Sequence, residues 1–217
     1  MPTPYALSSD LVSAWPAKSL EVATYLDTAL AAKAPSASPT FTGTVTFTGA
    51  AVVGISSGLT FITSGALSGS ATSVNSCFTS TYANYRIVVS GLYCSGNTFM
   101  KMRLRASGTD DSAASYEYAG NNVVVAPTTF TVGATDTFWD IAGDTLVDPD
   151  RQAIVIEVQS PQLATRTNYS SFAGGGNGLS TRAGIKNVTT QFDSFTLFPN
   201  AGTFSGGTVH VYGYQKS

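Results

Sequence analysis

The residues that decide the fold class are Phe99-Met100-Lys101-Met102-Arg103-Leu104-Arg105-Ala106. Methionine and leucine alternate here with lysine and arginine, which is the period of two expected for a β-strand with one buried and one solvated face. Similar patterns predict strands at residues 85–90, 152–158 and 208–214, and further strands at 121–126, 129–133, 166–172, 181–190 and 192–198. Turn residues at 107–114 and 173–180 separate them. Many short strands without helical stretches between them predict an antiparallel β-sandwich, jelly-roll-like, over residues 72–217.

Two six-residue repeats lie upstream of these strands, Thr40-Phe41-Thr42-Gly43-Thr44-Val45 and Thr46-Phe47-Thr48-Gly49-Ala50-Ala51. Phe41 aligns with Phe47, and Gly43 aligns with Gly49. Each repeat is too short to bury its apolar side chains within one chain, so we expect copies from other subunits to stack on it. The pattern predicts a β-repeat shaft of a homo-oligomer over residues 39–71. A Thr/Gly-rich linker is the alternative.

The residues before the repeats are Leu30-Ala31-Ala32-Lys33-Ala34-Pro35-Ser36-Ala37-Ser38-Pro39. Together with the first repeat they resemble the alanine-rich helix, Lys-Ala-Pro, Ser-Pro, Phe-Thr-Gly repeat of bacteriophage tail-fibre proteins. That motif occurs once here, whereas long fibres carry many copies, so the resemblance implies a short fibre. Lys33 and Pro35 match the junction at which the helix gives way to the shaft. Residues 192–214 and 82–86 are similar to the distal domains of small phage fibre and virion-surface proteins, a similarity that brings no catalytic motif.

Residues 1–38 are interpreted as a virion-anchoring arm followed by a short helix at about 19–32. The anchoring side chains would be Tyr5, Leu7, Leu11 and Trp15, which are too apolar for a free tail. The helix has one apolar stripe, so it needs a partner: symmetry-related copies or a surface of a larger particle. We expect the N-terminus to contact other virion structural proteins.

The composition excludes several classes of protein. Of 217 residues only 11% are charged, the net charge is −2, and no run of Lys or Arg is present, so nucleic-acid binding is not expected. No apolar stretch is long enough for membrane insertion, and the N-terminus lacks a secretory signal pattern. We expect assembly in the host cytoplasm and a final location in the virion. Cys77 and Cys94 are expected to be buried free thiols, with a disulfide as the alternative.

Candidate catalytic groups are few. His210 is the single histidine and lies in an alternating strand without a nucleophile motif, so a surface or interface role is expected. The aspartates at 136, 140, 144, 148 and 150 match no calcium-loop pattern, and we interpret them as solvated turn residues. The glycine-rich stretch 173–178 lacks the ending of a phosphate-binding loop and is interpreted as an inter-strand loop. The sequence therefore predicts no enzyme, no cofactor and no metal site.

Aromatic residues are the remaining candidates for binding. Tyr116, Tyr118, Trp139 and Tyr169 flank polar stretches, as in a surface that stacks on saccharide rings, although sandwich cores and subunit interfaces need the same rings.

These observations together predict a structural virion protein: a homotrimeric phage tail fibre whose distal β domain attaches to a saccharide or protein on the host surface. A head fibre or capsid decoration protein is the first alternative. A polysaccharide depolymerase is the second, and it would require paired carboxylates in a groove.

Overall fold

A computed structural model describes residues 58–96, 98–124, 128–143, 152–175 and 178–215. The predicted anchor, helix and shaft repeat, including Tyr5, Leu7, Leu11, Trp15, Phe41, Gly43, Phe47 and Gly49, lie outside these residues. The described chain forms thirteen strands: β1 (Leu59–Ala66), β2 (Thr72–Val74), β3 (Asn84–Cys94), β4 (Met100–Ala106), β5 (Thr109–Asp110), β6 (Tyr116–Val124), β7 (Thr129–Asp136), β8 (Trp139–Ala142), β9 (Gln152–Gln159), β10 (Thr167–Gly175), β11 (Gly178–Lys186), β12 (Ser194–Pro199) and β13 (Phe204–Tyr214).

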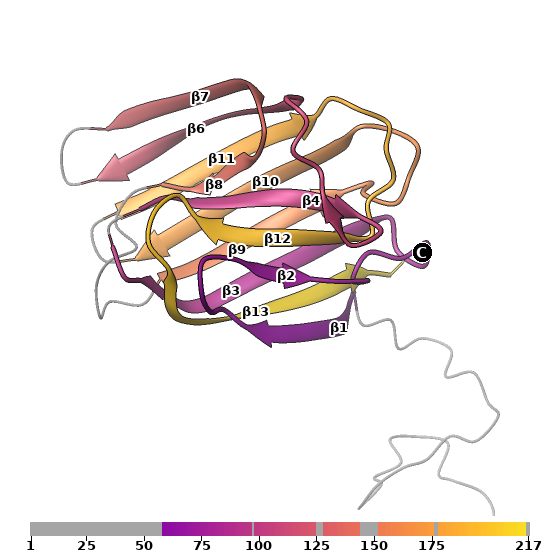
Figure 1. Cartoon of the computed structure of the whole chain (residues 1–217), viewed down its shortest axis with the longest axis horizontal. Helices are drawn as coiled ribbons and strands as arrows, with labels where there is room; N and C mark the ends of the chain where they lie inside the picture. The colour runs from indigo at the N-terminus through magenta and orange to yellow at the C-terminus, as the bar shows by residue number, and fades with distance from the viewer. Residues whose placement is uncertain (1–57, 97, 125–127, 144–151, 176–177, 216–217) are drawn as a thin grey trace, which may run out of the picture. The chain divides into compact units, whose positions relative to one another are not determined.

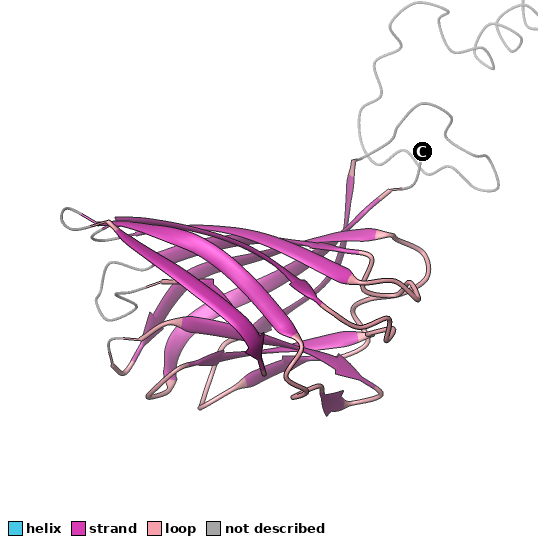
Figure 2. Cartoon of the chain, turned by 90° about the horizontal axis from the view of Figure 1, so that it is seen from above, coloured by secondary structure: helices cyan, strands magenta, loops and turns pink. Residues whose placement is uncertain are grey.

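The strands form two antiparallel sheets that lie face to face (Figures 1 and 2). The larger sheet has eight strands in the order β1-β13-β3-β9-β10-β11-β6-β7. The smaller sheet has five, in the order β2-β12-β4-β5 with β8 also paired to β4. The prediction of a mainly β fold with antiparallel sheets is therefore confirmed, and the described residues contain no helix.

Distant parts of the chain are joined in both sheets. Early strands pair with late ones, β1 with β13 in the larger sheet and β2 with β12 in the smaller. Consecutive strands from β1 to β4 alternate between the two sheets: β1 and β3 belong to the larger sheet, and β2 and β4 belong to the smaller. The hairpins β6–β7 and β10–β11 then widen the larger sheet beyond β9.

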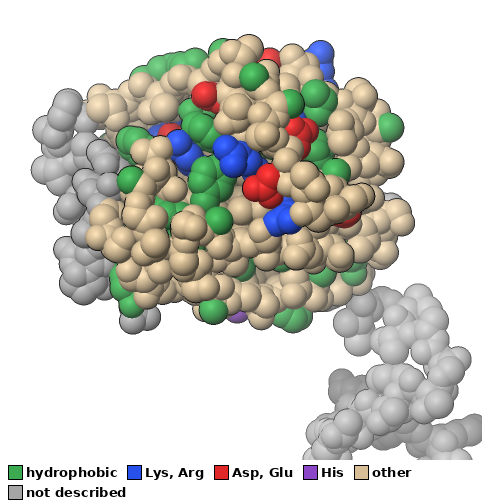
Figure 3. Space-filling model, in the orientation of Figure 1, with side chains coloured by type: hydrophobic (Ala, Val, Ile, Leu, Met, Phe, Trp, Pro, Cys, Tyr) green, Lys and Arg blue, Asp and Glu red, His purple; other side chains and the backbone are tan. Residues whose placement is uncertain are grey.

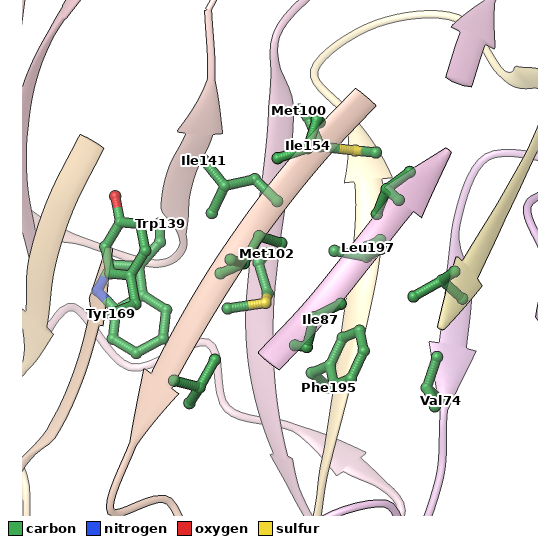
Figure 4. Close-up of a cluster of buried hydrophobic side chains, with 14 of the residues drawn as sticks. Val74, Ile87, Met100, Met102, Trp139, Ile141, Ile154, Tyr169, Phe195 and Leu197 are labelled. Carbon is green, nitrogen blue, oxygen red and sulfur yellow. The ribbon is translucent and has the colours of Figure 1, made fainter. Parts of the chain in front are cut away.

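The core lies between the layers and follows directly from the alternating sequences. Met100, Met102 and Leu104 of β4 are fully buried. Met100 and Met102 lie in the core with Ile87 of β3 and Ile154 of β9 (Figure 4). The lysine and arginines between them stay partly exposed, as predicted. Burying side chains of this size contributes about 1.5–3 kcal/mol each, so the alternation fixes which face of β4 turns inward.

The boundary predicted between shaft and distal domain is corrected by the structure. Residues 59–66 were assigned to the shaft, but they form β1, which pairs with β13 from Leu59↔Tyr214 to Ala66↔Thr208. Pairing along its whole length makes this segment the edge strand of the larger sheet. The distal domain therefore begins at about residue 58 rather than at 72.

Two smaller expectations can also be compared with the structure. Cys77 and Cys94 are free and buried, which confirms the prediction of unpaired thiols. The glycine-rich stretch expected to be an inter-strand loop is mostly strand, because β10 continues to Gly175 and β11 begins at Gly178. Glycine at these positions lets the two strands pair closely up to the turn.

Candidate functional site

Three of the four aromatic residues considered for saccharide contact lie in the core. Tyr116 and Trp139 are fully buried, and Tyr169 is 3% exposed. The ring of Trp139 lies between the other two, with centroids 5.3 Å from Tyr116 and 4.5 Å from Tyr169. A buried ring offers no face to a saccharide, so the expectation of direct contact is corrected for these three residues.

The polar atoms of these rings are all satisfied inside the domain. The Tyr116 hydroxyl donates to the Asp111 carbonyl at 2.8 Å and accepts from the Leu104 amide at 3.0 Å. The Tyr169 hydroxyl donates to the Asp140 carbonyl at 2.6 Å, and the Trp139 indole donates to the Ile185 carbonyl at 3.2 Å. The bonds of Tyr169 and Trp139 tie β8 of the smaller sheet to the larger sheet, and Tyr116 ties β6 to β4, which is a structural role.

Tyr118 takes a different position, partly exposed on β6 and beside β7. A Cβ on Gly133 of β7 would lie 2.3 Å from its ring, so the glycine makes room for it. Burial raises the pKa of the Tyr118 hydroxyl, and a hydrogen bond to Asp136 raises it further. The four aromatic residues therefore form no common binding surface.

A buried ion pair lies near the same rings. The Asp140 Oδ2 atom is 3.7 Å from Nε of Arg182 on β11, and both side chains are nearly inaccessible. Asp140 Oδ1 and Arg182 Nε have no hydrogen-bond partner among the described residues. Other atoms of Arg182 donate to the Asn121 carbonyl at 2.9 Å and to Asn122 Oδ1 at 2.8 Å. The prediction of a solvated residue is wrong for Asp140, which is a buried carboxylate because β8 lies in the smaller sheet and packs against β10 and β11 of the larger one.

The enclosed space beside this pair is too small for a ligand. The cavity measures about 10 Å³ and is lined by Asn122, Gly143, Gln152, Ala173, Gly178, Leu179 and Ser180. A volume of that size holds about one water molecule. The buried polar cluster therefore serves packing, and binding must be sought on the surface.

The outer face of the smaller sheet carries a row of cations on β4, Lys101, Arg103 and Arg105 (Figure 3). The Lys101 amine lies 3.7 Å from the centroid of the Phe138 ring, and the Arg103 guanidinium lies 4.8 Å from that of Phe198. The two rings also contact each other edge to face, with centroids 6.2 Å apart. We call these four side chains, Lys101, Arg103, Phe138 and Phe198, the β4 strip.

The third cation of the row is neutralised by neighbours. Arg105 Nε lies 3.3 Å from Asp110 Oδ1, its Nη1 donates to the hydroxyls of Ser73 and Thr196, and its Nη2 donates to the Gly108 carbonyl. Within the β4 strip, by contrast, Arg103 Nε donates to the Thr137 carbonyl at 2.9 Å, and Lys101 donates to the Asn200 side chain. Both hydrogen-bond partners are neutral, although the carboxylates of Asp140 and Asp136 act on Lys101 from a distance.

Cations held flat against aromatic rings suit an anionic ligand with an apolar ring face. Burial lowers the pKa of the Lys101 amine, and the nearby carboxylates of Asp140 and Asp136 oppose this effect, so the charge is partly desolvated. The rings would stack on a sugar face while the cations bind a carboxylate, sulfate or phosphate. The alternation in β4 was sufficient to predict that its cations lie on the solvated face. Phe138 and Phe198 come from other parts of the chain, and the pairing of β8 and β12 with β4 places them beside these cations.

His210 lies partly exposed on β13 of the larger sheet, away from the β4 strip. Among the described residues, no group of three or more His, Cys, Asp or Glu side chains is placed to hold a metal ion. Within the same residues, no helix is long and apolar enough to cross a bilayer.

Comparisons with known proteins leave the chain without an assigned relative. No protein-family model, no curated protein and no solved structure matches it.

Proposed function

We propose that this chain is a homotrimeric virion appendage, a bacteriophage tail fibre, with an N-terminal anchor, a short shaft and a distal domain that attaches to the host surface. The observation that carries the proposal is the order of parts along the chain. The tail-fibre-like repeat at residues 30–51 is followed directly by a two-sheet β domain that begins at about residue 58.

The strand order supports a jelly-roll-like assignment for that domain. Four neighbouring strands of the larger sheet run β1-β13-β3-β9, and four of the smaller sheet run β2-β12-β4-β5. Each sheet thus sets an early strand beside a late one and then continues with strands from the middle of the chain. Two interlocked four-stranded sheets of this kind are the jelly-roll arrangement, which recurs in viral capsid and lectin domains.

The β4 strip is the surface that we propose for host attachment, and an acidic saccharide is the ligand class its chemistry favours. Each strip is small, so a single contact would be weak. Three copies on one fibre would present three strips, and the second and third contacts would form at high effective concentration. Adhesion of this kind needs no catalytic group, so we propose no enzymatic activity.

The binding part of the proposal is tested with polygalacturonate, an acidic polysaccharide, and dextran, a neutral one. We expect the full chain to bind polygalacturonate, to release it at high salt, and not to bind dextran. The double variant Lys101→Gln/Arg103→Gln should lose retention, and Arg166→Gln, which removes an exposed cation elsewhere, should keep it. Equal retention by both variants would overturn the role of the β4 strip.

The location on the particle is tested with an antibody against the domain, used to label intact virions in the electron microscope. Label on the tail supports the proposal. Label on the head supports the alternative, a head fibre or decoration protein, which would have the same anchor and distal domain. Virions without label would refute both, and loss of viscosity of a capsular polysaccharide on incubation would favour the depolymerase instead.

A further inference from the structure

The outer face of the larger sheet is apolar over its half formed by β9, β10, β11, β6 and β7. Most of the exposed large apolar side chains of the described residues lie in this half, and five of them stand 49–68% exposed: Val123, Phe130, Val132, Phe172 and Leu179. A single exposed leucine or phenylalanine is ordinary, but a contiguous group on one face marks a contact surface.

The strand registers show that these residues share one face. Partners across antiparallel strands point to the same side of a sheet. One row runs Val155, Phe172, Thr181, Asn121, Phe130 across the five strands. The row on one side of it runs Ala153, Gly174, Leu179, Val123, and the row on the other side runs Glu157, Ser170, Ala183, Ala119, Val132. We call these fourteen positions the outer patch.

Charge is nearly absent from the outer patch. Its single ionic residue is Glu157 at one corner, and that carboxylate is paired with Arg86 at 2.5 Å and accepts from Tyr214 at 2.8 Å. The outer face of β4, by comparison, carries three cations in seven residues. Glycine, alanine and serine stand between the large side chains, so a second flat surface can approach closely. The outer face of β4 is thus charged and solvated, whereas the outer patch is nearly uncharged.

We infer that the outer patch packs against a second copy of this chain. This inference rests on the proposed function and names the surface through which its distal domains associate. A face without charge cannot select a foreign partner by charge complementarity. In the proposed trimer the contacts are cyclic, so one edge of the outer patch would pack against a different edge of the same patch on the neighbouring copy.

The size of the face fits a stable contact. Eight strands spaced about 4.8 Å apart and about nine residues long give a face of roughly 1,100 Å². A standard interface requires about 800 Å² from each partner. The larger sheet can therefore supply the area of a complete subunit contact, with the outer patch as its apolar part at the β7 end of the sheet.

The place where the preceding chain joins the domain supplies the second argument for this occupant. Fifty-seven residues, which include the shaft repeat, precede Gly58, and they lead into β1, the edge strand of this same sheet. If the repeats assemble copies, they hold the domains together at an effective concentration in the millimolar range. Contacts of modest affinity between outer patches would then be occupied in every fibre. The smaller sheets, with their β4 strips, would remain accessible on the opposite side.

The test uses the full chain and a cysteine at the centre of the outer patch, Thr181→Cys, labelled with a maleimide reagent. The native cysteines are buried, so labelling reports on the new thiol. Ser112→Cys, an exposed turn position outside the patch, is the matched control. We expect an oligomer by light scattering, with the thiol at 181 labelled at least about tenfold more slowly than the thiol at 112 because the patch must open first. A short bis-maleimide should link copies through position 181.

A second pair of variants separates burial by another copy from other causes. Phe172→Lys in the Thr181→Cys background should restore fast labelling, since a buried cation would break the contact. Leu163→Lys, at a residue of similar exposure outside the patch, should not.

Each outcome bears on a different part of the reasoning. An oligomer whose thiol at 181 reacts as fast as the one at 112 overturns the inference but leaves the fibre proposal standing. A monomer with a protected thiol also overturns it, since a segment of the same chain would then cover the patch. A monomer with a reactive thiol overturns both the inference and the homotrimeric fibre.

Discussion

Replacing Asp140 by Asn should remove a pH dependence of stability that runs opposite to the usual one for a carboxylate. Asp140 is 5% exposed, its Oδ1 atom has no partner among the described residues, and its pairing with Arg182 spans 3.7 Å. Burial outweighs the attraction of Arg182 and raises the pKa of Asp140 from 3.8 to about 6. The carboxylate is therefore less stable in the folded chain than in the unfolded one.

The sign of the effect follows from proton binding. Between about pH 4 and pH 6 the folded chain holds a proton on Asp140 that the unfolded chain has released. The free energy of unfolding contributed by this group therefore falls as the pH rises through that window. Each unit of pKa shift corresponds to about 1.4 kcal/mol, so the total loss amounts to roughly 3 kcal/mol, most of it between pH 4 and pH 7.

The measurement is urea unfolding of the native chain and of Asp140→Asn, followed by circular dichroism at pH 4, 5, 6 and 7 and at fixed protein concentration. Other carboxylates titrate in both proteins, so the difference between the two free energies isolates Asp140. That difference, native minus variant, should fall by about 3 kcal/mol from pH 4 to pH 7. A flat difference, or one that rises with pH, would show that the buried environment of Asp140 is not as described.

Three further predictions test the packing of the domain. Lys186→Met should lower the free energy of unfolding by about 3 kcal/mol, because the fully buried amine lies 3.1 Å from Asp111. Lys101→Met on the outer face of β4 should lower it by less than about 1 kcal/mol. Denaturant titration measures both changes. Gly184→Ala should lower the melting temperature strongly, because the new Cβ would lie 2.2 Å from a backbone oxygen. Gly65→Ala, whose Cβ would have its nearest contact at 4.0 Å, should change the melting temperature little. Similar shifts for both variants would contradict the packing described. Burial raises the pKa of the two native thiols to about 12 and about 11, so neither should react with a thiol reagent at pH 8 until the chain unfolds, and rapid reaction of the native protein would contradict their burial.

The sequence was sufficient to predict the strands whose alternation is strong. In β4 every second residue is apolar, so both the strand and its buried face could be predicted. β1 was not predicted because it is an edge strand with neither face fully buried, so its sequence shows no clear alternation of apolar and polar residues. β8 was not predicted because all four of its residues are buried, so it has no alternation of buried and exposed positions.

Neither the candidate site nor the aromatic core could be predicted from local pattern. Trp139 and Tyr169 are thirty positions apart and meet only because β8 packs against β10. Phe138 and Phe198 likewise reach the β4 strip through the pairing of β8 and β12 with β4. Local sequence sets which residues can be buried, but long-range strand pairing decides which of them become neighbours.

The position of β13 between β1 and β3 constrains when the domain can fold during synthesis. Until residues 204–214 have left the ribosome, β1 has no partner among the strands already made, and the exposed edge of β3 stays open. If the repeats join copies as proposed, a nascent chain that already carries them would meet its sister chains before its own distal sheet is closed. Assembly order in the cell would then depend on whether the shaft waits for the last strand, and ribosome pausing near the codon for Phe204 would lengthen the period in which unfinished sheets can pair wrongly.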